Sequence, residues 1–110
     1  MLSGADVVLQ ALWTLLSTEP GERLRRPDWG CGLRSYLFAP NTVNTRASIR
    51  RNVLRAIERF EPRVHDVSVE VRANPREPNR VEIELRFEVI GSTSPRNLVY
   101  PFYLQPEGAR

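Results

Sequence analysis

The chain has 110 residues, the length of one domain, and all sixteen of its basic residues are arginine, with a formal net charge of +3. This charge is too small to indicate a nucleic-acid-binding protein, and the single cysteine, Cys31, excludes an intrachain disulfide. With one cysteine and one histidine, His65, the chain cannot make a zinc site from these residue types alone. We therefore expect no metal, no cofactor and no nucleic acid among its ligands.

No segment has the length or composition of a membrane span or an export signal. The apolar run from Val7 to Leu16 is too short to cross a bilayer and is interrupted by Gln10. Asp6 stands where a signal peptide would carry lysine or arginine. The expectation is a protein that is made in the cytoplasm and does not insert into membranes.

The first third of the chain predicts one helix followed by an irregular, glycine-rich segment. Residues 4–17 are apolar on most sides, which predicts a helix with Ser3 as its N-cap. A short extended piece is expected at 22–26, and then a tight turn from Gly30 to Gly32, where glycine permits positive φ. A short apolar element follows at 35–38.

A second, longer helix is predicted over residues 45–60, with Asn44 or Thr45 as its N-cap. Apolar residues recur along it at spacings of three and four and make one stripe for the core: Ile49, Val53, Ala56, Ile57 and Phe60. Three arginines spaced by four lie opposite this stripe: Arg51, Arg55 and Arg59. We interpret the arginine row as a solvated face, with contact to an acidic partner as the alternative, because charged rows usually face water.

The second helix runs into a predicted corner at Glu61, Pro62 and Arg63. A residue that precedes proline is pushed out of the α region, so the helix should end with Phe60 as its last buried contact. The proline ring fixes φ between two residues of opposite charge. The sequence thus predicts a rigid corner, and leaves open whether its charges pair with each other or face a partner.

Residues 67–73 and 81–89 alternate between apolar and polar side chains, which predicts two antiparallel strands joined by a loop at 74–80. Their apolar face should pack on a helix. Their charged face can form pairs across the strands, for example between Arg72 and Glu82.

A third strand is predicted at 98–104, at an edge of the sheet or bulged, because Pro101 cannot donate a hydrogen bond to a ladder. The tail at 106–110 is expected to be flexible. The predicted fold of residues 1–110 is therefore α+β: a small single domain with two main helices packed on one face of a mainly antiparallel β-sheet.

No catalytic set is complete within the sequence. His65 has no positioned nucleophile, and neither a P-loop nor a dinucleotide-binding motif is present. Glu22, Asp28 and Glu61 are carboxylates of the kind a glycosidase needs, but each has an arginine close in sequence. An adjacent arginine favours the ionised carboxylate, which cannot serve as a general acid. We therefore expect no catalytic residue.

Several short motifs occur in a particular order: Gly21-Glu22-Arg23, then Arg26-Pro27-Asp28-Trp29-Gly30-Cys31-Gly32-Leu33, and then Glu61-Pro62-Arg63 at the end of a helix. In this order and at these distances they resemble the baseplate wedge proteins of contractile phage tails. The type VI secretion component TssE and its counterparts in extracellular injection systems belong to the same group. The resemblance covers about residues 5–104 and leaves open which of the three systems the chain serves.

The resemblance implies a structural protein that docks on the core bundle of the larger wedge subunits around the central spike, in an assembled tail or injection particle. The docking element would be Glu61, Pro62 and Arg63. The structural motif of the upstream segment would comprise Gly21, Glu22, Arg23, Pro27, Gly30 and Gly32. Spike or hub proteins are further candidate partners.

The resemblance also implies that the domain templates the sheath by exchanging strands with sheath subunits. From Pro101 and the chain order, we expect the sheath-facing edge to carry Leu98, Tyr100 and Phe102. The family has also been labelled lysozyme-like, and a glycosidase that cleaves peptidoglycan is the alternative function.

Overall fold

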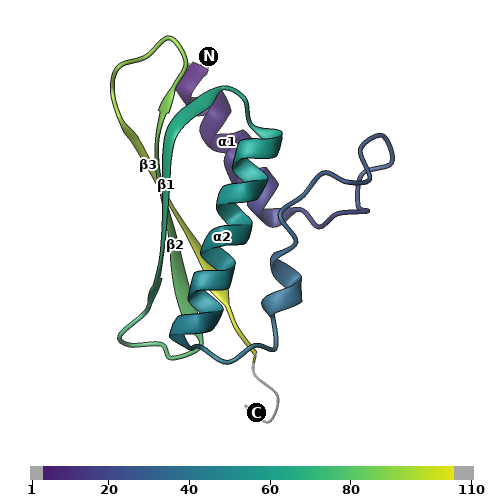
Figure 1. Cartoon of the computed structure of the whole chain (residues 1–110), viewed down its shortest axis with the longest axis vertical. Helices are drawn as coiled ribbons and strands as arrows, with labels where there is room; N and C mark the ends of the chain where they lie inside the picture. Colours follow the sequence, from purple (N-terminus) through teal and green to yellow (C-terminus); the bar gives the residue numbers. More distant parts are fainter. Residues whose placement is uncertain (1–3, 106–110) are drawn as a thin grey trace.

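The computed structural model describes residues 4–105 and has an α+β fold in which two helices cover one face of a three-stranded sheet (Figure 1). The predicted fold class is confirmed. Ser3, expected as a cap, and the tail at 106–110 lie outside the described residues. The elements in chain order are α1 (Gly4–Ser17), the 3₁₀-helix η1 (Leu33–Tyr36), α2 (Val43–Phe60), β1 (Val64–Ala73), β2 (Arg80–Val89) and β3 (Arg96–Tyr103).

The sheet is an antiparallel meander in the order β1-β2-β3, and its register places the apolar residues of neighbouring strands side by side. Val69 lies opposite Leu85, and Ile83 lies between Val71 on β1 and Tyr100 on β3. This face packs on the predicted stripe of α2, of which all but Phe60 is fully buried, and on the inner side of α1. One core therefore joins both helices to the sheet. None of the helices within 4–105 is long and apolar enough to cross a membrane.

Helix α2 begins two residues earlier than predicted, and its cap was assigned to the wrong residue. The cap is Thr42, whose backbone is extended and whose side-chain oxygen accepts a hydrogen bond from the Thr45 backbone N–H at 3.2 Å. Thr45 can cap nothing, because it already lies within the first turn. Both predicted caps, Asn44 and Thr45, were therefore wrong, and the cap lies two to three residues earlier in the sequence.

Other boundaries also differ from the predictions. Residues 22–26 form bends and irregular backbone instead of an extended piece, and the apolar element expected at 35–38 is the end of η1 and a turn. Strand β1 starts at Val64 because a bulge between His65 and Ser68 lets the chain pair with β2 before its regular alternation begins.

On the outer face of the sheet, Arg72 lies opposite Glu82 as predicted, but its guanidinium pairs instead with Glu84 and Glu70. The Glu82 carboxylate is already bound by Asn74 at 2.9 Å and by Arg80 at 3.3 Å. Because an arginine side chain can reach the diagonal neighbour on the adjacent strand, Arg72 pairs with Glu84.

Candidate functional site

The corner between α2 and β1 is built by the end of the helix and one proline. Glu61 closes α2, since its backbone N–H donates to the Ile57 carbonyl at 2.9 Å and its φ and ψ have left the helical region. Pro62 then turns the chain into β1, where the Arg63 carbonyl accepts a hydrogen bond from Ile90 at 2.8 Å. The predicted rigid corner is present, with both sides of it tied to regular elements.

The two charges of the corner bind each other. Arg63 donates to the Glu61 carboxylate from Nε at 2.8 Å and from Nη2 at 2.7 Å, and its backbone N–H donates at 3.2 Å. Two parallel N–H···O bonds of this kind fix the orientation of the guanidinium as well as its position. The question that the sequence left open is thus answered in favour of pairing within the monomer.

The pair is asymmetric in its exposure and in its electrostatics. The Glu61 side chain is 5% exposed, whereas that of Arg63 is 50% exposed. Burial alone would raise the pKa of Glu61, but the hydrogen bonds and the charge of Arg63 outweigh it and hold that pKa below its ordinary value of 4.5. Nη1 of Arg63 makes no bond within the described residues, so it remains available at the surface.

The segment that precedes η1 folds back against the C-terminal end of α2, beside the corner. The rings of Trp29 and Phe60 lie 6.3 Å apart, and the guanidinium of Arg23 stacks over Trp29 at 4.2 Å. Arg59 lies over Phe60 at 4.8 Å and pairs with Asp28 at 2.9 Å. Segments about thirty residues apart in the sequence therefore form one surface, which the sequence alone did not reveal.

The glycines and the glutamate of this segment hold its shape. A Cβ at Gly30 would lie 2.7 Å from the Thr18 carbonyl oxygen, so no larger residue fits there without a shift of the backbone. The Gly21 N–H donates to the Pro27 carbonyl at 2.6 Å, and Gly32 starts η1 with a φ of 80°. Glu22 accepts a hydrogen bond from the Glu19 backbone at 2.5 Å.

Strand β3 is an edge of the sheet, and neighbouring contacts show which of its backbone groups face outward. The Leu104 N–H donates to Asn79 beside β2, while the Gln105 N–H points the other way, to Leu37. Since successive residues of a strand alternate in direction, the odd-numbered residues of β3 face the free edge. The missing N–H of Pro101 falls on that edge, and Val99 presents both of its backbone groups there.

The opposite edge, on β1, is partly covered. The side chain of Arg50 on α2 donates from Nε to the Val69 carbonyl at 2.8 Å, and the bulge at His65–Ser68 distorts the same edge. Side chains and bulges of this kind discourage pairing with another chain. Only β3 offers a free edge along most of its length, within the described residues. Leu98, Tyr100 and Phe102, which were expected to mark it, have side chains that face the helices.

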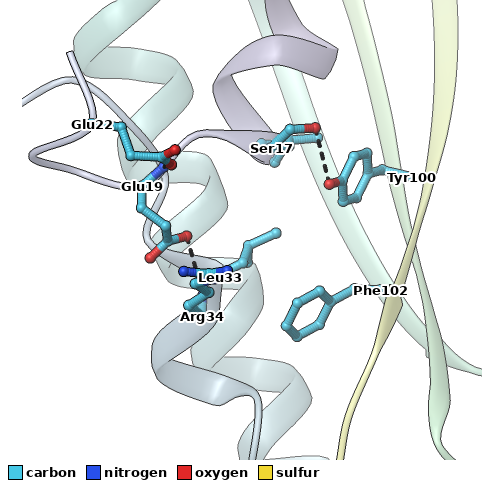
Figure 2. Close-up of a pocket in the computed structure, with 8 residues that line it drawn as sticks. Ser17, Glu19, Glu22, Leu33, Arg34, Tyr100 and Phe102 are labelled. Atoms are coloured by element: carbon cyan, nitrogen blue, oxygen red, sulfur yellow. Dashed lines mark hydrogen bonds between the residues drawn. The ribbon is translucent and has the colours of Figure 1, made fainter.

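A hollow of about 210 Å³ opens between the end of α1, η1 and β3 (Figure 2). Its floor is apolar, and Tyr100 is held at its wall by a 3.0 Å hydrogen bond between its hydroxyl and Ser17. The lining residues are Leu16, Ser17, Glu19, Glu22, Leu33, Arg34, Tyr100 and Phe102. Nothing in the sequence signalled this hollow, because three separate segments contribute to it.

The groups that could carry catalysis or bind a metal are poorly suited to either. Burial, followed by the charge of Glu19, raises the pKa of the Cys31 thiol to about 12, so this thiol is not a nucleophile at neutral pH. His65, Asp66 and Glu88 bring three ligand atoms within 4.8 Å of one another, but His65 is already bonded to Asp66 at 3.0 Å. Exposed groups of this kind are common without a metal.

The sequence and the fold both match known baseplate proteins. A family model described as baseplate wedge protein gp25 matches residues 2–94. Baseplate wedge protein gp25 of Enterobacteria phage T4 is 30% identical over 87 residues, which are 79% of this chain and 65% of the phage protein. The chain thus spans slightly less than two thirds of that relative.

Solved structures give the same picture of the fold. A Geobacter sulfurreducens protein, provisionally named a tail lysozyme, has a TM-score of 0.87 at 31% identity, covering 97% of this chain and 96% of that one. A chain in the baseplate complex from the type VI secretion system has a TM-score of 0.72 at 20% identity, covering 90% and 92%. At this lower identity the second match concerns the fold alone.

The asymmetry of the corner predicts how its stability depends on pH. We expect Arg63→Ala to lower the free energy of unfolding at neutral pH by about 1–3 kcal/mol, because it leaves a buried carboxylate with one backbone donor. In the wild type, the ionised Glu61 makes its full contribution to the free energy of unfolding above its ordinary pKa of 4.5. This contribution is lost as the pH falls through the lowered pKa of Glu61 in the folded protein. In the variant, only the backbone N–H of residue 63 still opposes the effect of burial, so the pKa of Glu61 rises above its wild-type value and protonation removes the cost of the buried charge.

The deficit of Arg63→Ala relative to the wild type should therefore shrink as the pH falls below the ordinary pKa of 4.5. Denaturant unfolding at neutral and acidic pH measures it. Arg51→Ala is the matched control, since Arg51 is exposed on α2 and makes no hydrogen bond or ion pair within the described residues. A deficit that is equal at both pH values would contradict the role assigned to Glu61.

Proposed function

This chain belongs to the gp25 family of baseplate wedge proteins, and on that premise we propose that it is a structural wedge subunit that works by binding and not by catalysis. Its partners would be the larger wedge subunits that form the core bundle, the sheath protein, and spike or hub proteins. The assembled particle would be a contractile tail or a contractile injection system. The sequence matches to baseplate wedge protein gp25 support this proposal.

Docking on the core bundle would use the corner, and the half-exposed Arg63 is the observation that carries this assignment. The buried Glu61 carboxylate holds the Nε–Nη2 edge of the guanidinium, so Arg63 projects Nη1 into solvent in a fixed orientation. An arginine ordered before binding loses little side-chain entropy when it meets a carboxylate on a partner. Pro62 contributes by fixing the backbone on which both residues sit.

The neighbouring surface extends the same chemistry. Arg23, Arg26 and Arg59 stack on the Trp29 and Phe60 rings at 4.2 to 5.7 Å, and of these only Arg59 has a carboxylate partner, Asp28. Stacking holds each planar guanidinium group flat against an aromatic ring, while the N–H groups at its edges stay available for hydrogen bonds. The docking surface would therefore favour an acidic face of the partner.

Sheath templating would use the free edge of β3. The unpaired backbone groups of Asn97 and Val99 can accept a strand from another chain, whereas β1 is hindered by Arg50 and by its bulge. Pro101 would limit the register of the added strand, because it offers no donor on that edge.

A peptidoglycan-cleaving glycosidase is the alternative function, and the provisional name of the Geobacter sulfurreducens structure is its support. The corner argues against it. A general acid needs a raised pKa, whereas the pKa of Glu61 is lowered. Asp28 is likewise paired with Arg59 at 2.9 Å.

Arg63→Lys tests docking. Lysine keeps the charge and one hydrogen bond to Glu61 but loses the paired hydrogen bonds of the guanidinium. The monomer should therefore fold, but it should bind the co-expressed core-bundle subunits at least roughly 30-fold more weakly. Size-exclusion chromatography of the complex, followed by affinity measurement, gives the result. Arg51→Lys, at an exposed position of α2, serves as the control. Docking through the corner would be wrong if Arg63→Lys bound like the wild type.

Val99→Pro tests strand addition. It removes one outward N–H, which is not used by β2, so the fold should survive while affinity for the sheath protein falls by about tenfold or more. Val99→Thr keeps the N–H and the branched side chain and is the control. Co-purification with the sheath protein and titration of the two variants provide the measurement. Equal binding by both variants would place the sheath contact elsewhere.

Pure protein should not clear a suspension of peptidoglycan, because the pKa of Glu61 is lowered and Asp28 is paired with Arg59, so neither carboxylate is suited to donate a proton. Turbidity measured over several hours against a known lysozyme provides the check. Clearing by the wild type that is lost in Glu22→Gln or Glu61→Gln would instead establish the glycosidase.

A further inference from the structure

The hollow beside β3 has the size for one side chain of a partner. Its volume of about 210 Å³ lies below the range of roughly 300–1,000 Å³ that is usual for small-molecule sites. It is open at the surface, and Leu16 and Leu33 form an apolar floor. A long side chain with an apolar stem would fit this floor better than a compact polar ligand.

Two carboxylates lie at the mouth of the hollow, and neither forms an ion pair within the described residues. Glu19 and Glu22 line it together, and their carboxylates accept bonds only from the backbone N–H groups of Arg34 and Glu19. Helix α1 ends at the same place with no basic residue in its last turn, so the negative end of its dipole adds to the potential. These features favour a cationic occupant.

Two aromatic rings face the carboxylates across the hollow. Figure 2 shows Glu19 and Glu22 on one side and Tyr100 and Phe102 on the other. Tyr100 is held in place from two directions, by Ser17 at 3.0 Å and by the edge of the Trp13 ring, whose centroid is 4.6 Å away. Aromatic faces attract guanidinium and ammonium groups, so the walls and the mouth of the hollow select the same kind of group.

The hollow adjoins the free edge of β3. Tyr100 and Phe102 project toward the helices from the strand whose Asn97 and Val99 backbone groups are free. A strand added to this edge would alternate its side chains between the two faces of the sheet, so every second side chain would lie beside Tyr100 and Phe102.

We propose that the hollow binds one arginine or lysine side chain carried by the segment that adds to β3. The inference rests on the strand addition proposed above and adds to it a requirement for a basic residue at one helix-facing position. The apolar stem of that residue lies on Leu16 and Leu33, its cationic end meets Glu19 and Glu22, and the two aromatic rings flank it. Arg34, which lines the hollow and is itself exposed, is the competing cation within the chain.

N-acetyl-arginine methylamide, with its neutral isostere N-acetyl-citrulline methylamide, tests the inference on the unmodified protein. We expect the arginine compound to shift the ring NMR signals of Tyr100 and Phe102, with at least about tenfold higher affinity than the citrulline compound and with weakening in salt. Equal affinity for the two compounds, or no shift with the arginine compound, would overturn the inference.

The double variant Glu19→Gln/Glu22→Gln removes the charge, but its amide oxygens can still accept the two backbone hydrogen bonds. It should bind the arginine compound at least about tenfold more weakly, and Glu77→Gln, on the exposed loop after β1, should not. Arg34→Ala removes the cation that competes for the hollow within the chain. It should leave the affinity for the arginine compound unchanged or raise it. Weaker binding in Arg34→Ala than in the wild type would contradict the proposed occupant.

The same double variant, measured against the sheath protein, separates this inference from the proposed function. If the double variant loses binding of the arginine compound and binds the sheath protein about tenfold more weakly, both the occupant of the hollow and the strand addition are supported. Sheath binding that depends on Val99 but not on Glu19 and Glu22 would overturn the inference that the hollow binds a basic side chain. It would leave the proposed strand addition unaffected. Arginine binding that depends on the two glutamates, with no sheath binding, would overturn strand addition and with it the proposed source of the side chain.

Discussion

The corner at Pro62 is the constraint on which the rest of the molecule depends. It ends α2 after Phe60 and starts β1 at Val64, so the apolar stripe of the helix is laid across the sheet that the following strands build. The Glu61–Arg63 pair closes this turn with two side-chain hydrogen bonds of 2.7 and 2.8 Å. Because the pair is satisfied internally, the corner needs no partner to hold its shape, and the outer edge of Arg63 remains free for one.

The glycine-rich segment before η1 depends on the same corner. It has little regular structure of its own, and its shape comes from the close approach at Gly30 and from the Trp29–Phe60 contact. Arginines outnumber the carboxylates on the surface around the corner and give it a net positive charge. By contrast, the hollow near β3 has carboxylates at its mouth. The molecule thus carries two surfaces of opposite charge on different elements, which suits a small subunit that must bind more than one kind of neighbour.

The two edges of the sheet show how a short domain can control its own pairing. Arg50 and the bulge cover β1, while β3 leaves the backbone of Asn97 and Val99 open. Pro101 interrupts the open edge without disturbing β2, because its missing N–H points outward. An edge that is open over a few residues can take a strand in one register, yet offers little to uncontrolled aggregation.

Periodicity and proline positions in the sequence were enough to predict the fold class, both helices, the hairpin and the edge position of the last strand. Each of these features follows from local spacing along the chain or from a proline. Element starts were less accurate, since Thr42, Asn44 and Thr45 are all plausible caps and only packing selects one. The tertiary structure alone decided that Glu61 pairs with Arg63, that Arg72 reaches Glu84, and that Trp29 meets Phe60. It alone also assembled the hollow, because contacts between distant segments depend on side-chain reach and burial, which spacing along the chain does not encode.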